Sequence, residues 1–475
     1  MNKTSDNQTR LINYFDAIAQ KWDHWQGRNR YYHKTIEKLI EFLIRPHASV
    51  LEIGCATGDL LHALKPSIGV GVDISPTMIK CAQQKYPQYS FYPMDAEELV
   101  LDQKFDYVVM SDLVGHLCDI QRALERAHTV MTPRSRLIIA YYNFLWEPIL
   151  LLAEKLSLKT PQPRQNWINA HDLHNFLDLA DFEIIRSGYR LLFPKNIPVI
   201  SWFLNKYLSQ LPLLRKLCVV RFIVARPRTQ EIHPERFSVS VIIPARNERG
   251  NIERAVQRIP VMGNKTEIIF VEGGSTDGTL EEVQRVVETY GKKNALSYYV
   301  QSGIGKANAV REGFARATGD ILMILDADLT VAPEDLPKFY SAIAANRGEF
   351  VNGSRLVYPM EEQAMRFLNL LGNKFFSLMF TYLLDQKFKD TLCGTKVLFK
   401  SDYEKISANR SYFGEFDPFG DFDLIFGAAK QNLKIVEMPI RYAERTYGET
   451  NIQRWRHGLL LLKMVLVAAR RMKFV

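Results

Sequence analysis

The sequence predicts an α/β protein made of two doubly wound domains. Short β-rich runs alternate with glycine-bearing turns and helical patterns in both halves of the chain, and this alternation is typical of parallel sheets covered by helices. The segment ARPRTQEIHPERF, residues 225–237, breaks both patterns with prolines and charges, as interdomain linkers do. We therefore expect a first domain over residues 1–226, a linker over 227–237 and a second domain over 238–475.

Composition and charge restrict the class of protein. Of the 475 residues, 47% are hydrophobic and 24% are charged, which is ordinary for folded globular chains. The formal net charge of +9 favours anionic partners such as nucleotides, phospholipid head groups or phosphorylated lipids. The basic residues are dispersed and no base-flipping motif is apparent, so we expect no nucleic-acid partner.

Cysteine usage and hydropathy indicate a compartment. The five cysteines are scattered and form no CxxC pair, which argues against a disulfide framework and a structural zinc site. The N-terminus lacks the apolar run of a signal peptide. No stretch of about 18 uncharged apolar residues predicts a transmembrane helix. We expect a cytoplasmic protein.

The first domain carries a glycine-bearing turn between a strand and a helix. In SVLEIGCATGDLL, residues 49–61, Gly54 and Gly58 flank the turn, where glycine lets backbone amides approach a ligand closely. The next predicted strand ends in Asp73, where a carboxylate can accept ribose hydroxyl protons. A third ends in Asp95, well placed for an adenine amino group. The turn alone also suits a nicotinamide enzyme.

The ordered series LEIGCATG, VDIS, MDAEEL, FDYVVMSD and MTPRSRLIIA resembles the class I S-adenosylmethionine-dependent methyltransferases across about residues 10–226. Ala56 stands where the family has its central glycine, and residues 14–25 resemble its lid helix. The resemblance implies a Rossmann-like fold that binds S-adenosylmethionine and methylates an acceptor. The cofactor-binding residues that it implies are Glu52, Gly54, Gly58, Asp73 and Asp95.

Two alternatives remain open for this domain. His116 lies where several members of the family place an active-site histidine; it is a candidate catalytic base for a hydroxyl acceptor, or a packing residue at the start of a helix. The domain itself is an active methyltransferase, or a scaffold module that only binds S-adenosylmethionine. The apolar segment 191–224 is an interfacial helix or acceptor cap, or a helix packed on its own domain.

The second domain contains the run ILMILDADLT, residues 321–330. We expect a buried strand that ends in Asp326 and Asp328. Residues two apart in a strand point to the same side, so both carboxylates can reach one site. Hard oxygen ligands suit Mg²⁺ or Mn²⁺, which bind a diphosphate and offset its charge as it leaves.

Together with VSVIIPARNE, VEGGSTDGT and GKANAV, this run resembles the family 2 glycosyltransferases of the GT-A fold across about residues 238–450. The resemblance implies a nucleotide-sugar donor, linked to UDP or GDP. Gly273 replaces the second acid of the usual VDDGS, which leaves the base open. The donor-binding residues implied are Pro244, Arg246, Glu248, Glu272, Lys306 and Asp326, with Asp328 as a metal ligand and catalytic residue.

Three downstream segments look like polyprenyl-phosphate sugar synthases of the dolichol-phosphate mannosyltransferase type: NGSRL, DTLCGTKVLF and IVEMPIRYAERTYGETN. The resemblance implies inverting transfer to a lipid phosphate. It places Arg355, Arg366 and Arg445 at the phosphate, where guanidinium binds bidentately. An alternative is a glycan or small-molecule hydroxyl acceptor, with Asp421 in FGDFDL as the general base; Asp421 can also simply cap a helix.

Two apolar segments with basic residues indicate a membrane surface. They are residues 365–384 and the tail from 454 to 475. Both fit helices lying in a bilayer interface with arginines on anionic head groups, and both also fit core helices with basic ends. We expect peripheral association on the cytoplasmic face, in a bifunctional enzyme of cell-envelope or glycolipid assembly.

Overall fold

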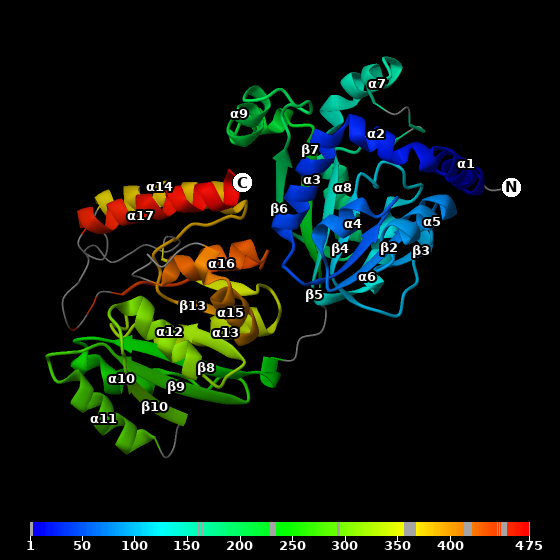
Figure 1. Cartoon of the computed structure of the whole chain (residues 1–475). Coiled ribbons are helices and arrows are strands. Elements are labelled where there is room, and N and C mark those ends of the chain that lie inside the picture. Colours follow the sequence, from blue (N-terminus) through cyan, green and yellow to red (C-terminus); the bar gives the residue numbers. More distant parts are fainter. Residues whose placement is uncertain are drawn as a thin grey trace. The chain divides into compact units, whose positions relative to one another are not determined.

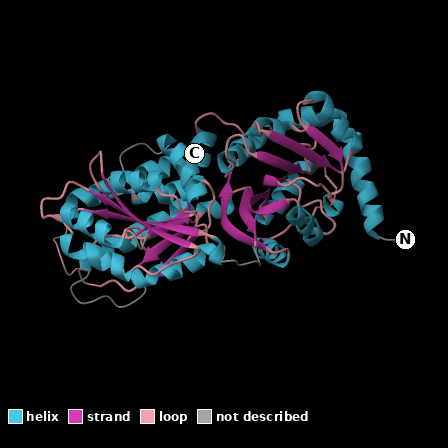
Figure 2. Cartoon of the chain, turned by 90° about the horizontal axis from the view of Figure 1, so that it is seen from below, coloured by secondary structure: helices cyan, strands magenta, loops and turns pink. Residues whose placement is uncertain are grey.

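The computed structural model describes residues 3–159, 162–163, 165–228, 234–291, 295–355, 367–412, 420–443, 445, 447 and 454–474. The chain divides into two compact units, one containing residues 1–229 and the other residues 230–473. In each unit, helices surround a sheet of seven described strands (Figures 1 and 2). The predicted α/β class is confirmed.

The first sheet has the strand order β3-β2-β1-β4-β5-β7-β6. The pairings from β3 to β5 are parallel, as predicted, but β7 is antiparallel to both β5 and β6. The excursion over residues 191–219 returns the chain at the end of the sheet where β6 leaves it, since Arg190 pairs with Val220, so β7 must run backwards. The strands are β1 (Ser49–Ile53), β2 (Ile68–Asp73), β3 (Ser90–Pro93), β4 (Phe105–Ser111), β5 (Met131–Tyr142), β6 (Phe182–Arg190) and β7 (Val220–Pro227).

Both faces of this sheet are buried, as the side chains of β5 show. Leu137 and Ile139 pack into one apolar cluster, which includes residues of α6 and α8, and Ile138 and Ala140 pack into the other, which includes residues of α3, α4 and α5. Alternation with burial on both sides is expected of a strand covered by helices. The helices are α1 (Lys3–Ile18), α2 (Trp22–Arg28), α3 (Arg30–Leu43), α4 (Asp59–Leu64), α5 (Pro76–Lys85), α6 (Ile120–Thr129), α7 (Glu147–Lys155), α8 (Ala170–Leu179) and α9 (Ile200–Lys206).

The second sheet has the order β10-β9-β8-β11-β13-β12-β14. Its pairings are parallel except that β13 is antiparallel to both β11 and β12, which departs from the expected parallel sheet. β13, which follows α14 in the chain, lies between β11 and β12 and runs in the opposite direction to both. The strands are β8 (Ser238–Ala245), β9 (Lys265–Glu272), β10 (Ala295–Val300), β11 (Ile321–Ile324), β12 (Phe350–Ser354), β13 (Lys396–Phe399) and β14 (Ile435–Pro439).

Helices also cover both faces of the second sheet. One apolar cluster includes residues of α10, α11 and α13, and the other includes residues of α12, α14, α15, α16 and α17. Along β8, Val241 and Ile243 belong to the first cluster and Ile242 to the second. The helices are α10 (Ile252–Arg258), α11 (Thr279–Tyr290), α12 (Lys306–Arg316), α13 (Leu336–Ala344), α14 (Phe367–Leu384), α15 (Lys400–Ala408), α16 (Asp421–Lys430) and α17 (Arg454–Ala468).

The helices α14 and α17 lie side by side (Figure 1). Phe380 of α14 and Met464 of α17 are buried in the core, whereas Leu378, Leu459 and Leu466 are more than 60% exposed. Each helix therefore packs one side on the domain and presents apolar side chains on another. Among the described residues, no helix combines the length and hydropathy needed to cross a bilayer.

Candidate active sites

The turn after β1 has the backbone geometry that its glycines predict. Gly54 and Gly58 both have φ of 79°, and Ala56 between them has φ of 45°. A Cβ on Gly54 would lie 2.9 Å from Cδ1 of Leu113, a side-chain end that can shift, so the positive φ is the main reason for glycine at this position. Ala56 adopts the left-handed conformation at a cost that a small side chain keeps low.

Two carboxylates hold this turn in place. Asp73, at the end of β2, accepts hydrogen bonds from the amides of Ala56 and Ser75, both at 2.9 Å. Glu52 accepts one from the amide of Leu61 at 3.0 Å and so fixes the start of α4. Burial raises the pKa of Asp73 and raises that of Glu52 well above its usual range. Both predicted cofactor residues thus shape the turn.

Asp95 contacts the N-terminal helix α1. Its Oδ1 accepts from the amide of Glu97 at 2.9 Å, and its Oδ2 accepts from Nε2 of Gln8 in α1 at 2.7 Å. The predicted lid segment, residues 14–25, comprises the end of α1, a short 3₁₀ turn and the start of α2. Asp16 anchors it by accepting hydrogen bonds from the Ser75 hydroxyl at 2.5 Å and from the amide of Thr77 at 3.1 Å.

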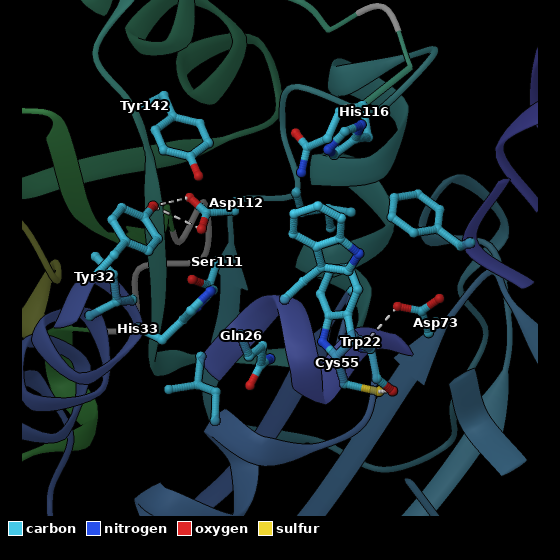
Figure 3. Close-up of a pocket in the computed structure, with 18 of the residues that line it drawn as sticks. Trp22, Gln26, Tyr32, His33, Cys55, Asp73, Ser111, Asp112, His116 and Tyr142 are labelled. Atoms are coloured by element: carbon cyan, nitrogen blue, oxygen red, sulfur yellow. Dashed lines mark hydrogen bonds between the residues drawn. The ribbon is translucent and has the colours of Figure 1, made fainter. Parts of the chain in front are cut away.

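A cavity of about 410 Å³ brings these groups together. Its lining includes Gly54, Asp73, Asp95 and His116. Asp73 and His116 are labelled in Figure 3. This volume is within the usual range for a cofactor or small-molecule site. Much of the remaining wall is apolar or aromatic: Phe15, Trp22, Trp25, Tyr32, Tyr142, Trp146, Ile149 and Leu150.

His116 lines the cavity as an uncharged imidazole. Its Nε2 lies 3.0 Å from Nε2 of Gln165, and its ring meets the ring of Phe15 edge-on at 5.5 Å between centroids. Burial lowers the pKa of His116 to about 4. Its Nδ1 is buried without a hydrogen-bond partner among the described residues.

Sequence reasoning missed two further polar residues of the cavity. Asp112 follows β4, and the hydroxyl of Tyr32 in α3 donates to both oxygens of its carboxylate at 2.8 Å (Figure 3). Burial raises the pKa of Asp112 to about 6. The available signal was the position of Asp112 at the carboxyl end of a strand beside the glycine turn, which is where α/β folds place ligands.

In the second domain, β11 ends at Ile324, so Asp326 and Asp328 lie in the turn after the strand rather than within it. The expected strand alternation therefore does not orient them; the turn does, with the amide of Leu329 donating to the carbonyl of Asp326 at 3.2 Å. Oδ1 of Asp326 lies 2.5 Å from Nζ of Lys306, the first residue of α12. Burial alone would raise the pKa of Asp326, but the charge of Lys306 lowers it.

Asp328 has a different set of partners. Its Oδ2 accepts from Nη2 of Arg445 at 2.8 Å, and its Oδ1 accepts from the Thr330 hydroxyl at 2.8 Å. Nη1 of Arg445 lies 3.3 Å from Oε1 of Glu248. Burial raises the pKa of Glu248, although Arg445 opposes this effect. The structure thus joins a predicted metal ligand, Asp328, a predicted donor residue, Glu248, and a predicted acceptor residue, Arg445.

The other predicted donor residues lie along the same sheet edge. Glu272 ends β9 and accepts hydrogen bonds from the amides of Gly274 at 3.1 Å and Ser275 at 2.6 Å, so it shapes the turn that follows. Pro244 is the penultimate residue of β8, and Arg246 comes directly after that strand.

Gly394 is a site residue that the sequence did not single out. A Cβ there would lie 2.0 Å from Oδ2 of Asp326 and 2.6 Å from Nζ of Lys306. The space beside Asp326 therefore exists because residue 394 has no side chain. No group of three or more His, Cys, Asp or Glu side chains in the described ranges is arranged to bind a metal. The pair Asp326 and Asp328 still fits Mg²⁺ or Mn²⁺, which commonly take one or two carboxylates together with substrate phosphates.

Of the remaining predicted residues, the structure describes the side chain of Arg355 but not those of Arg366 and Asp421. Arg355 forms a two-pronged ion pair with the fully buried Asp390, with Nε at 2.7 Å from Oδ2 and Nη2 at 2.8 Å from Oδ1. Its guanidinium also lies 5.1 Å from the ring centroid of Tyr442. Arg366 lies outside the described residues. Asp421 is the first residue of α16, and its side chain is likewise outside the description.

Comparison with known proteins finds a family model that matches a segment of each half. Residues 24–187 match the family described as methyltransferase domain. Residues 240–407 match glycosyl transferase family 2. A dolichol-phosphate mannosyltransferase of Pyrococcus furiosus is 31% identical over 220 residues, which are 45% of this chain and 59% of that relative. The chain thus spans about three fifths of the length of this curated relative.

Solved structures similar to this chain include methyltransferases. An S-adenosylmethionine-dependent methyltransferase of Thermotoga maritima is 16% identical, with a TM-score of 0.36, over 46% of this chain and 99% of that one. A magnesium protoporphyrin IX methyltransferase of Synechocystis, solved with S-adenosylhomocysteine, is 19% identical, with a TM-score of 0.35, over 46% of this chain and 99% of that one. The chain therefore joins a segment similar to a methyltransferase domain to a segment similar to glycosyl transferase family 2.

Proposed function

We propose that the second domain transfers a sugar from a nucleotide diphosphate donor to a polyprenyl phosphate, with inversion. The observation that carries this proposal is the gathering of two carboxylates and two cations at one sheet edge: Asp326 with Lys306, and Asp328 with Arg445. Such a set suits a divalent metal and two phosphate-bearing substrates. The similarity to a dolichol-phosphate mannosyltransferase supports the same acceptor class.

Asp326 and Asp328 would hold Mg²⁺ or Mn²⁺. When bound, the metal neutralises charge on the departing diphosphate. Lys306 and Arg445, which the carboxylates now hold, would turn to phosphate oxygens once the carboxylates bind metal. Glu272 and the turn that it shapes lie beside the end of β8, where the amide of Gly273 donates to the carbonyl of Ala245 at 2.9 Å. Pro244, Arg246 and Glu248, at and just after the end of β8, would receive the nucleoside.

A phosphate acceptor removes the need for a protein base, because its attacking oxygen is already anionic. Positioning then matters most, and guanidinium groups bind phosphate in a fixed geometry. Arg445 is placed beside Asp328. Arg355 is immobilised by Asp390 through two of its five N–H donors, which leaves others for a phosphate. Arg366 belongs to the same proposed set.

The test is a donor screen followed by an acceptor comparison. Sugar-nucleotide hydrolysis with Mn²⁺ across UDP- and GDP-linked donors would identify the donor, and transfer to undecaprenyl or dolichyl phosphate would identify the acceptor. Asp421→Asn decides between acceptor classes. Near-normal transfer to lipid phosphate supports the proposal, whereas a severe loss of turnover in a folded variant supports a hydroxyl acceptor with Asp421 as base.

We infer that the first domain binds S-adenosylmethionine and transfers its methyl group to an acceptor of the same biosynthetic process. The glycine turn, the carboxylate of Asp73 and the cavity between them and His116 support this inference. Isothermal titration of the whole protein with S-adenosylmethionine tests it. Absence of binding would reject methyl transfer, and binding without any transfer would favour a scaffold role.

We also infer that the enzyme associates peripherally with the cytoplasmic face of a membrane, as enzymes of cell-envelope assembly that use lipid phosphates must. Exposed leucines on α14 and α17 support this inference, because an apolar helix face with nearby basic residues suits a bilayer interface. All five cysteines are free, which fits a reducing compartment. Sedimentation with anionic and zwitterionic vesicles tests it; equal, negligible binding to both would contradict it.

A further inference from the structure

Asp112 and Tyr32 form a polar pair in the cavity of the first domain that no step described so far uses. The Tyr32 hydroxyl donates to both oxygens of the Asp112 carboxylate at 2.8 Å, and the ring of Tyr142 stacks on that of Tyr32 at 5.6 Å between centroids. Figure 3 shows these three side chains gathered at one end of the cavity and Asp73 at the other. They therefore lie apart from Asp73, the carboxylate proposed to bind the cofactor ribose.

The backbone of Asp112 is strained. Its φ is 53°, a left-handed conformation that residues with side chains adopt uncommonly. The amide of Asp112 donates to the carbonyl of Ala140 in β5 at 2.8 Å, which holds the residue in this conformation. Strain of this kind persists only where the surrounding structure imposes it, and it is concentrated at active sites. Here the strained residue carries a carboxylate that lines the cavity.

The surroundings of Asp112 make it an unusually basic carboxylate. Burial raises its pKa to about 6, and the Tyr32 hydrogen bond and the charge of Lys159 oppose that rise. Among the described residues, the titratable and charged groups that face it are Tyr32 from α3, Tyr142 from β5 and Lys159 after α7. Such a carboxylate is ionised at neutral pH yet accepts a proton more readily than an ordinary one.

We propose that Asp112 binds the hydroxyl group of the methyl acceptor and accepts its proton, so that the first domain is an O-methyltransferase. This proposal rests on the proposed methyl transfer. The acceptor oxygen forms a bond to the methyl carbon while the methyl–sulfur bond breaks, and the electron pair of that bond stays on sulfur. The hydroxyl proton moves to the Asp112 carboxylate. The products are a methyl ether and S-adenosylhomocysteine.

The wall of the cavity indicates what carries this hydroxyl. Trp22, Trp146, Ile149 and Leu150 line it with aromatic and aliphatic surface, which suits an alcohol or phenol on an apolar body. Tyr32 is a positioning residue, because its hydroxyl fixes the carboxylate without reaching the reacting atoms. His116 is the weaker base, with its pKa near 4 and its Nε2 beside Gln165.

The proposal is tested on the whole chain with saturating S-adenosylmethionine. Phenol, catechol and benzyl alcohol serve as hydroxyl probes, and benzylamine serves as an amine probe; release of S-adenosylhomocysteine is measured. We expect transfer to a hydroxyl probe that falls about 100-fold or more in Asp112→Asn, the usual contribution of a positioned base. Asp102→Asn, an exposed carboxylate in the loop before β4, is the matched control and should keep full activity.

A second readout needs no cofactor. In protein labelled with ¹³C at the aspartate carboxyl, one resonance should titrate near pH 6 and disappear in Asp112→Asn. Tyr32→Phe should move its midpoint upward, because the lost hydrogen bond lowers the pKa of Asp112. A midpoint near the ordinary value of about 4, transfer to benzylamine alone, no transfer to any hydroxyl probe, or an Asp112→Asn variant within about threefold of the parent would each overturn the proposal. If S-adenosylmethionine itself does not bind, the proposed methyl transfer fails as well.

Discussion

The guanidinium of Arg445 lies on the carboxylate of Asp328, with Nη2 2.8 Å from Oδ2. The two residues come from segments 117 positions apart, one just after β11 and the other after β14. Glu248 holds the other side of the same guanidinium at 3.3 Å. Burial lowers the pKa of Arg445, but the neighbouring carboxylates raise it by more. Arg445 therefore stays charged throughout the accessible pH range. The proposed metal and acceptor sites are thus in direct contact.

Asp328→Asn should abolish metal-dependent donor binding. Removing the charge removes one of the two carboxylates proposed to hold the metal, while the amide still fits the space. Isothermal titration with UDP and GDP, with and without Mn²⁺, measures the effect. Asp335→Asn, which breaks only a surface ion pair with Lys338, is the control. Unchanged affinity in Mn²⁺ would refute the metal assignment.

Gly394→Ala should impair donor binding while the domain stays folded. The added Cβ would meet Oδ2 of Asp326 at 2.0 Å and displace that carboxylate or the loop. We expect a drop in Mn²⁺-dependent nucleotide affinity of tenfold or more, about 1.4 kcal/mol. Gly372→Ala in α14, where nothing lies within 4 Å of the new Cβ, provides the comparison. Equal affinities in the two variants would show that the space beside Asp326 is not needed.

Arg355→Met should destabilise the second domain. It leaves the carboxylate of Asp390 buried without its partner, and breaking a buried pair typically costs about 3–5 kcal/mol. Burial would raise the pKa of Asp390, but Arg355 lowers it; the pair therefore stabilises the fold above the unfolded pKa of Asp390, and this contribution is lost as the pH falls through the folded pKa. Urea unfolding measures the loss. The double variant Arg355→Met with Asp390→Leu should recover part of it; if it does not, the pair is not the source.

His116→Gln should change how stability responds to acid. The folded pKa of His116 is about 4, below its unfolded value of about 6.5, so the unfolded chain binds the extra proton first as the pH falls from 6.5 to 4. The parent protein is then destabilised by about 2 kcal/mol at pH 5 relative to pH 7.5 through this residue, and the variant is not. Denaturant titrations at both pH values measure the difference. Parallel shifts in parent and variant would contradict the burial of a neutral imidazole.

The sequence predicted most of the residues at the strand ends that form the candidate sites, but not the contacts between distant segments. Gly54, Asp73 and Asp95 could be placed because strand ends and glycine turns have local signatures. The reversed strand β7 could not be, because its direction depends on where the excursion over residues 191–219 returns. Gly394 and Tyr32 could not be identified either, because each matters through a contact with a distant part of the sequence. Gly394 leaves space beside Asp326, and Tyr32 donates a hydrogen bond to a residue 80 positions away.

The two ion pairs at the proposed glycosyltransferase site have a thermodynamic consequence. Lys306 and Arg445 already neutralise Asp326 and Asp328, so a metal that arrives alone must displace cations that then lose these carboxylates as counter-charges. A diphosphate that arrives alone meets cations already engaged. When both arrive, each carboxylate exchanges a cation for the metal and each cation exchanges a carboxylate for phosphate. Under the proposed function, metal and donor should therefore bind with positive cooperativity, each raising the affinity of the other by the same factor.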